Sequence, residues 1–161
     1  MEINISVIMG IYNCADTLAE ALDSLLWQTY QDFEVILCDD GSTDNTVEVA
    51  KQYVNKYPDK FILLRNEQNL GLNKTLNKCL HQARGKYIAR MDGDDISLPE
   101  RFQKEIDALE THPEFAVIST PMIFFDKNGD WKTGTAIEYP EKKDFIKHSP
   151  FFCHAPCMVR K

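Results

Sequence analysis

One continuous stretch of the chain is Glu34-Val35-Ile36-Leu37-Cys38-Asp39-Asp40-Gly41-Ser42-Thr43-Asp44. Its first half is an almost unbroken apolar run, which predicts a strand covered on both faces in a parallel sheet. Its second half is an acidic turn with a glycine, and it opens a helical pattern in which Ser42 is placed as the N-cap. The stretch therefore predicts a strand, a turn and a helix in succession.

The same alternation extends on both sides of this stretch. Apolar runs predict further strands over residues 3–9, 61–64, 86–89 and 115–118. Apolar residues at helical spacing predict helices between them, with Asn13 as the N-cap of the first, Gly85 ending the third and Pro99 opening the fourth. Strands that alternate with helices are typical of an α/β fold. We expect a Rossmann-like, mostly parallel sheet sandwiched by helices, in a single domain over residues 1–161.

The last quarter of the sequence has a less regular pattern. Lys127-Asn128-Gly129-Asp130 predicts a hairpin turn, because Asn-Gly is a strong turn signal. Residues 142–148 are expected to form a helix, and an apolar stretch surrounds Met158. No repeat or low-complexity segment separates this part from the rest.

Charge and composition limit the partners. The 161 residues carry a formal net charge of −7, which would repel the phosphate backbone of a nucleic acid. An anionic small ligand would need a bound cation. No apolar run is long enough to span a bilayer, the N-terminus lacks a basic leader, and the five cysteines lie mostly in apolar segments. We therefore expect a cytoplasmic protein without a transmembrane segment.

Acidic residues follow two of the predicted strands, at the edge where ligands bind in parallel α/β sheets. Asp92-Gly93-Asp94-Asp95 would place two hard oxygen ligands near one point, as Mg²⁺ or Mn²⁺ requires. The alternative is that these residues are ordinary turn and cap residues. A second acidic cluster begins at Asp39, and a carboxylate there can accept a hydrogen bond from the imide N–H of a nucleobase. Two such clusters together favour a ligand-binding site over ordinary turn residues.

The motifs resemble those of the family 2 glycosyltransferases. The matching segments, in order, are residues 7–13, 25–30, 35–44, 69–73 and 92–95, within a similarity that covers about residues 5 to 105. Residues 98–102 and 154–160 also look like segments of that family. The resemblance implies the GT-A fold and the N-terminal, nucleotide-sugar-binding portion of such an enzyme.

The resemblance also implies roles for individual residues. The segment Ile11-Tyr12-Asn13 would line the base pocket, Asp39 would contact the base, and Asp94 would hold the metal that bridges to the diphosphate. The remaining nucleotide-side residues are Asp40, Arg65, Asn69, Lys74, Asp92 and Gly93, with Asp92 also a candidate metal ligand. His154 would lie on the acceptor side.

The implied reaction is inverting transfer of a sugar from a nucleoside-diphosphate-sugar, expected to be a UDP-sugar. Its acceptor would be a glycan or a lipid-linked glycan in cell-surface polysaccharide synthesis, and Mn²⁺ or Mg²⁺ would be the cofactor. Peripheral membrane association of the full-length protein is compatible with such an acceptor. The donor sugar and the oligomeric state cannot be read from the sequence.

The catalytic base of the family lies in a later Glu-Asp pair, so we expect it beyond Lys161 and the chain to be truncated on its acceptor side. The surroundings of Glu138, Glu141 and Asp144 do not match that pair. A fragment that binds nucleotide and metal without transfer activity is the alternative. A phosphoryl-accepting receiver domain fits the spacing of the aspartates poorly, and Cys153, His154 and Cys157 are too few for a structural zinc site.

Overall fold

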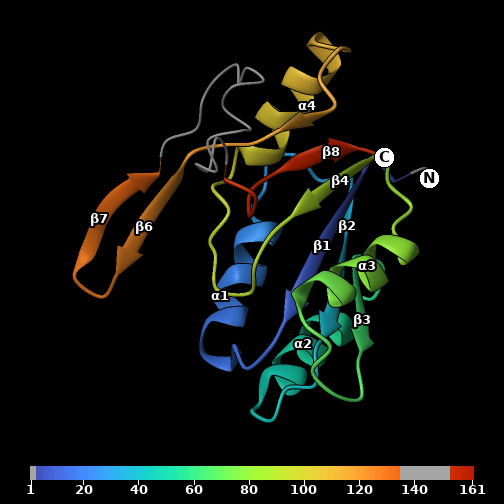
Figure 1. Ribbon diagram of the computed structural model, residues 1–161, viewed down its shortest axis with the longest axis vertical. Helices are drawn as coiled ribbons and strands as arrows, with labels where there is room; N and C mark the ends of the chain where they lie inside the picture. The colour runs from blue at the N-terminus through green and yellow to red at the C-terminus, as the bar shows by residue number, and fades with distance from the viewer. Residues whose placement is uncertain (1–2, 135–152) are drawn as a thin grey trace.

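The computed structural model describes residues 3–134 and 153–161 (Figure 1). Strands and helices alternate in its first two thirds, as the sequence predicts. The helices are α1 (Ala15–Leu26), α2 (Thr46–Lys56), α3 (Leu72–Gln82) and α4 (Arg101–Thr111). The strands are β1 (Ile5–Ile11), β2 (Phe33–Asp39), β3 (Phe61–Arg65), β4 (Tyr87–Arg90), β5 (Val117–Ile118), β6 (Met122–Asp126), β7 (Gly129–Gly134) and β8 (Met158–Arg160).

Six strands form one sheet in the order β3-β2-β1-β4-β8-β5. The four strands from β3 to β4 are parallel, whereas β8 runs antiparallel to both of its neighbours. Strands β6 and β7 form a separate hairpin, which projects away from the main sheet in Figure 1. The mostly parallel α/β sheet predicted from the sequence is confirmed, and so is the hairpin turn at residues 127–130.

Helices cover both faces of the sheet because the side chains of each strand alternate between them. On β1, Val7 and Met9 pack into a large core with α1, α2 and α4. Ile8 points to the other face, where it meets Cys79 of α3 and Ile36 of β2 in a smaller core. Strands β1 and β2 are apolar on both faces for this reason, which explains their unbroken apolar runs.

Glu34 is the acidic exception within β2, and its side chain is buried. Its carboxylate accepts a hydrogen bond from Ser6 Oγ at 2.7 Å and one from Arg84 Nε at 2.9 Å. Arg84 lies immediately before β4, at the end of the sheet opposite to the predicted site. This ion pair fixes the start of β4 against β1 and β2.

Three predicted helix starts are wrong in detail. Asn13 and Ser42 cap no helix, because their side chains bond to each other's loops instead, and α1 and α2 follow Cys14 and Asn45. Helix α4 begins at Arg101, two residues after Pro99. The helix predicted at 142–148, together with Glu138, Glu141 and Asp144, lies outside the described residues. Within the described part of the chain, no helix is long and apolar enough to cross a membrane.

Candidate active site

The carboxyl ends of β1, β2 and β4 meet at one edge of the sheet. Strand β1 has β2 and β3 on one side and β4 on the other, so the order in which strands are added to the sheet reverses between β1 and β4. Such a switch point leaves a crevice outside the strand ends, where ligands of open α/β sheets bind. A cleft of about 460 Å³ lies there, lined by Gly10, residues 12–17, Asp44 and residues 92–94.

The loop after β1 is tied to the loop after β2. Asn13 adopts a left-handed backbone conformation, with φ of 47°, which Asn tolerates better than most residues. Its backbone N–H donates to Ser42 Oγ at 3.0 Å, and its side-chain oxygen accepts from the Thr43 N–H at 2.9 Å. The two motifs that carried the sequence prediction therefore hold each other in place.

The N–H groups at the start of α1 donate hydrogen bonds to the same neighbouring loop and to the first residue of α2. The N–H of Cys14 donates to Thr46 Oγ1 at 2.8 Å, and the N–H of Ala15 donates to the Asp44 carboxylate at 3.2 Å. Asp44 also accepts from the N–H of Thr46 at 3.0 Å. These bonds satisfy helix N–H groups that have no partner inside the helix, so they replace a local cap.

The acidic turn after β4 approaches α1 closely at Gly93. A Cβ atom at Gly93 would lie 2.9 Å from the Cys14 sulfur and 3.2 Å from a methyl group of Ile11. Thr17 Oγ1 donates to the Gly93 carbonyl at 3.0 Å. Gly93 therefore lets the turn lie against α1, and this contact places the carboxylates of residues 92 and 94 along the cleft.

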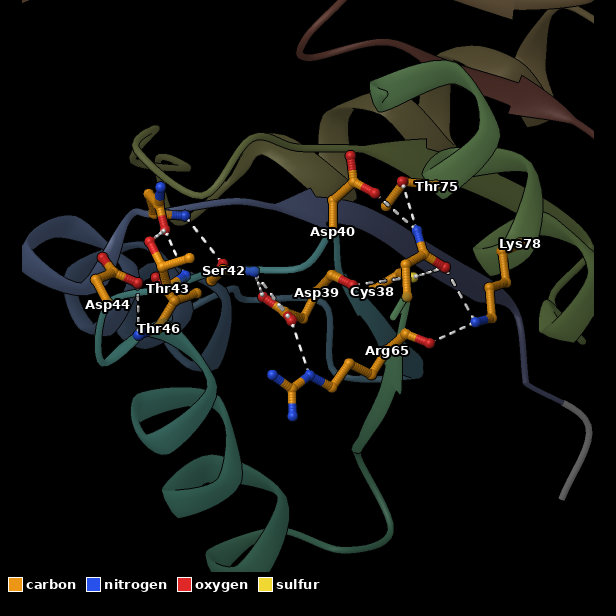
Figure 2. A network of polar contacts seen from close by, with 12 residues as sticks. Cys38, Asp39, Asp40, Ser42, Thr43, Asp44, Thr46, Arg65, Thr75 and Lys78 are labelled. Carbon is orange, nitrogen blue, oxygen red and sulfur yellow. Dashed lines mark hydrogen bonds and ion pairs between the residues drawn. The ribbon is translucent and has the colours of Figure 1, made fainter. Parts of the chain in front are cut away.

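Asp39 and Asp40 point in different directions, as Figure 2 shows. Asp39 is fully buried, and its carboxylate accepts a bond from the Ser42 N–H and pairs with Arg65 Nε at 3.3 Å. The Arg65 side chain is itself 61% exposed, so it covers the carboxylate from the solvent side. A nucleobase can therefore reach the Asp39 carboxylate only if the Arg65 side chain moves away.

Asp40 holds the loop between β3 and α3. Its carboxylate accepts hydrogen bonds from the N–H groups of Leu70 and Gly71, both at 2.9 Å, and from Asn66 Nδ2 at 2.8 Å. Burial alone would raise the pKa of Asp40, but these donors stabilise the charged form and the pKa is lowered. The loop thus depends on a buried, ionised carboxylate.

Arg90 connects the acidic turn to the segment before β8. It ends β4, is almost fully buried, and donates from Nη2 to both Asp92 oxygens at 2.7 and 3.0 Å. Its Nη1 lies 2.6 Å from Nδ1 of His154. The structure therefore brings Asp92 and His154 together through a residue that the sequence analysis did not single out.

Negative charge accumulates in the part of the acidic turn that follows Asp92. Asp94 is exposed to the cleft, and within the described residues its carboxylate accepts no hydrogen bond. Burial, followed by the charges of Asp92 and Asp94, raises the pKa of the neighbouring Asp95 carboxyl. A cation near Asp94 would offset this repulsion.

The donor set suits a cation that keeps most of its other ligands. Among residues 3–134 and 153–161, no three His, Cys, Asp or Glu side chains are grouped to hold a metal ion by themselves. Mg²⁺ and Mn²⁺ fit a site of one or two carboxylates, because they retain waters and bind substrate phosphates. Asp94, with Asp92 beside it, could provide that set, and both residues line the cleft.

The profile of glycosyl transferase family 2 matches residues 6–161 of this sequence. The chain belongs to this family. The family 2 chain is 47% identical over 156 residues to the putative glycosyltransferase EpsE of Bacillus subtilis, which covers 97% of the chain and 56% of the relative. It is also 37% identical over 112 residues to the UDP-Glc:alpha-D-GlcNAc-diphosphoundecaprenol beta-1,3-glucosyltransferase WfaP of Escherichia coli. That match covers 69% of this chain and 43% of the relative.

A solved structure gives the same fold. The structure of S. aureus TarS 1-349 in complex with UDP-GlcNAc superposes with a TM-score of 0.79 at 25% identity, over 98% of this chain and 45% of that one. The GT-A fold implied by the motifs is therefore confirmed. The family 2 chain spans about half the length of the relatives it matches.

The cleft is lined by none of the other predicted residues, which are Ile11, Asp39, Asp40, Arg65, Asn69, Lys74 and His154. Ile11 is buried beneath it, and Asn69 and Lys74 are exposed on the loop and first turn that lead into α3. Asn69 accepts a hydrogen bond from the Gly71 N–H at 3.1 Å. Arg90 was missed, although a lone arginine inside an apolar strand, directly before an acidic turn, is a signal for a buried ion pair.

A second buried ion pair supports Arg90 from behind. Arg101 of α4 donates from Nη2 to the Arg90 carbonyl at 2.9 Å and from Nε to Glu105 Oε1 at 3.2 Å. The other oxygen of Glu105 has no hydrogen-bond partner within the described chain. Burial raises the pKa of Glu105 to about 7, although the charge of Arg101 opposes this.

The raised pKa predicts that stability falls as the pH rises. The unfolded chain releases the Glu105 proton near pH 4.5 and the folded chain only near pH 7. Between these values the folded state binds more protons, so the free energy of unfolding decreases by at most roughly 3 kcal/mol. Glu105→Gln cannot ionise, and its stability relative to wild type should rise from pH 5 to pH 8 in urea unfolding. A difference that is constant with pH would contradict the raised pKa.

Proposed function

We propose that this chain forms the donor-binding part of an inverting glycosyltransferase that uses a UDP-sugar. The observation that carries the proposal is the cleft between the ends of β1 and β4. One wall has Tyr12 and Asn13, which present an aromatic ring and an amide, and the other has the acidic turn at residues 92–94. A nucleotide can lie along such a cleft, with its diphosphate toward the turn.

The diphosphate and the acidic turn carry the same sign of charge, so they require a cation between them. We propose that Asp94, assisted by Asp92, holds Mn²⁺ or Mg²⁺ for this purpose. The bound ion would stabilise the negative charge of the departing nucleoside diphosphate. Two further residues hold the acidic turn in position. Arg90 orients the Asp92 carboxylate, and Gly93 lets the turn lie against α1.

Asp39 is proposed to recognise the base. Its carboxylate follows β2 at the same edge of the sheet, and a carboxylate accepts the N–H of a uracil ring. Because Arg65 covers Asp39 in the described structure, binding requires the Arg65 side chain to rotate away. Arg65 is largely exposed, so its side chain can rotate into solvent, and the N–H of the base would then replace it as a partner of the buried Asp39 carboxylate.

A second cleft near His154 favours the proposal that the acceptor binds on that side of the molecule. It has a volume of about 690 Å³ and lies between residues 95–101, the β6–β7 hairpin and Ala155 and Pro156, which directly follow His154. Its apolar lining and the lipid-linked acceptor in the name of WfaP favour a lipid-linked glycan, which would bring the protein to a membrane surface.

Transfer would proceed as a single displacement at the anomeric carbon, which inverts its configuration. A base must remove the proton of the acceptor hydroxyl, typically contributing about 10²–10⁴-fold in rate. That role is assigned to none of the described residues. Asp92, Asp94 and the loops around them bind and orient the donor.

The proposal predicts that Asp39→Ala weakens the binding of uridine and of UDP by about tenfold or more, with or without metal, since a charge-assisted hydrogen bond contributes ~1.5–3 kcal/mol. Calorimetry with uridine, UDP and GDP measures this. The matched control is Asp32→Ala, which removes an exposed carboxylate just before β2, at the opposite end of the same strand. Circular dichroism checks that both variants fold. Uridine binding by Asp39→Ala at the wild-type affinity would refute the assignment.

A further inference from the structure

Arg90 makes polar contacts with four residues that lie in three other segments of the chain. Its guanidinium bonds to Asp92 in the acidic turn and to His154 before β8. Its backbone N–H donates to the Cys157 carbonyl at 2.9 Å, and its carbonyl accepts from Arg101 of α4. Both ends of the residue are therefore fixed, and its side chain has little freedom to leave the two groups that it contacts.

The contact between Arg90 and His154 determines which ring nitrogen of the histidine carries the proton. A guanidinium is always protonated and can only donate. At 2.6 Å from Nη1, the Nδ1 atom of His154 must therefore be the acceptor. The imidazole is then neutral, and its single N–H lies on Nε2.

We propose that Arg90 is a positioning residue that holds Asp92 at the cleft and fixes His154 as a neutral hydrogen-bond donor through Nε2. In this arrangement His154 cannot act as the catalytic base, because Nδ1 is occupied by Arg90 and Nε2 already carries a proton. His154 can instead donate to an oxygen atom of a ligand. The part of the inference that concerns Asp92 and nucleotide affinity rests on the proposed function, whereas the protonation of His154 does not.

The tautomer of His154 is measured directly by long-range ¹H–¹⁵N correlation NMR of the wild-type chain at pH 8, where an ordinary imidazole is neutral. The chain has four histidines, and the spectrum of His154→Gln identifies the signals of His154. We expect an unprotonated Nδ1 and a protonated Nε2. In Arg90→Met the acceptor role of Nδ1 is lost, so the two tautomers should both be populated.

Two further variants separate this role from a merely structural one. Arg90→Lys keeps a positive charge near Asp92 and is expected to fold even if Arg90→Met does not, but its single ammonium cannot hold both partners in the same fork. Arg84→Met is the matched control, since Arg84 also pairs with a carboxylate but lies before β4 rather than at its end. It should leave the His154 signals unchanged.

UDP affinity in Mn²⁺ is the second measurement, and Arg90→Met should lower it by about tenfold, as loss of a residue that orients a metal-binding carboxylate does. A protonated Nδ1 in the wild type, or the same tautomer populations in wild type and both Arg90 variants, would overturn the inference. If the wild type showed the expected tautomer but bound no UDP, the proposed function would fail and the Arg90–His154 contact would stand.

Discussion

Asp40→Asn is expected to lower the free energy of unfolding by roughly 3 kcal/mol, because it disrupts a buried network of charge-assisted hydrogen bonds. The Asp40 carboxylate accepts two N–H groups of the backbone and the side chain of Asn66. An asparagine can offer only one oxygen, so its NH₂ group would face the N–H of Gly71 or Leu70. The donor opposite that NH₂ group would lose its charged acceptor, and the Gly71 N–H would keep only its bond to Asn69 Oδ1 at 3.1 Å.

The loss is measured by urea unfolding at pH 7 and corresponds to about 10 °C in the melting temperature for a chain of this size. Asp59→Asn is the control, since Asp59 is an exposed carboxylate in the turn before β3 and should change stability by less than ~0.5 kcal/mol. The lowered pKa of Asp40 adds a second expectation: its stabilisation is present above the ordinary pKa of 3.8 and is lost as the pH falls below it. Equal stability of the two variants would show that the loop does not depend on Asp40.

Asp94→Asn is expected to lower the affinity for UDP in Mn²⁺ by about 100-fold, or about 2.7 kcal/mol, without weakening binding in excess chelator, where the loss of a like charge near the diphosphate favours it. The change removes the negative charge that would hold the cation and leaves the shape of the cleft intact. Because Asp94 is exposed and accepts no hydrogen bond from the described residues, we expect the stability to be unaffected. Calorimetry with and without metal gives both affinities.

Asp16→Asn provides the matched control for this experiment. Asp16 is an exposed carboxylate in the first turn of α1 and lines the same cleft, but it is not a predicted metal ligand. Its replacement should alter UDP affinity by less than threefold, as a change in general electrostatics near a surface does. If both variants lost affinity equally, the cleft would attract the cation through its total charge and Asp94 would have no special role.

The sequence predicted the sheet and its acidic edge because both depend on local patterns. Unbroken apolar runs identified β1 and β2, and the residues that directly follow parallel strands are brought to one edge by the topology alone. Asp92, Gly93 and Asp94 line the cleft for this reason, and their roles in binding stay a prediction. The different directions of Asp39 and Asp40 also follow from the sequence, because the side chains of consecutive strand residues point to opposite faces of the sheet.

The contacts between distant segments could not be predicted. Ser42 and Asn13 are good cap residues, yet each bonds to the other's loop, because the two loops follow neighbouring strand ends of the sheet. His154 lies 64 residues from Arg90 in the sequence. They meet because β8 enters the sheet antiparallel beside β4, a placement that no local pattern in the sequence specifies.

The most direct test of the central claim is a calorimetric titration of the wild-type chain with UDP and with uridine, in Mn²⁺ and in excess chelator. The account predicts that the metal strengthens the binding of UDP substantially and leaves the binding of uridine unchanged, because the cation links the acidic turn at residues 92–94 to the diphosphate. UDP binding with the same affinity in Mn²⁺ and in chelator would contradict it.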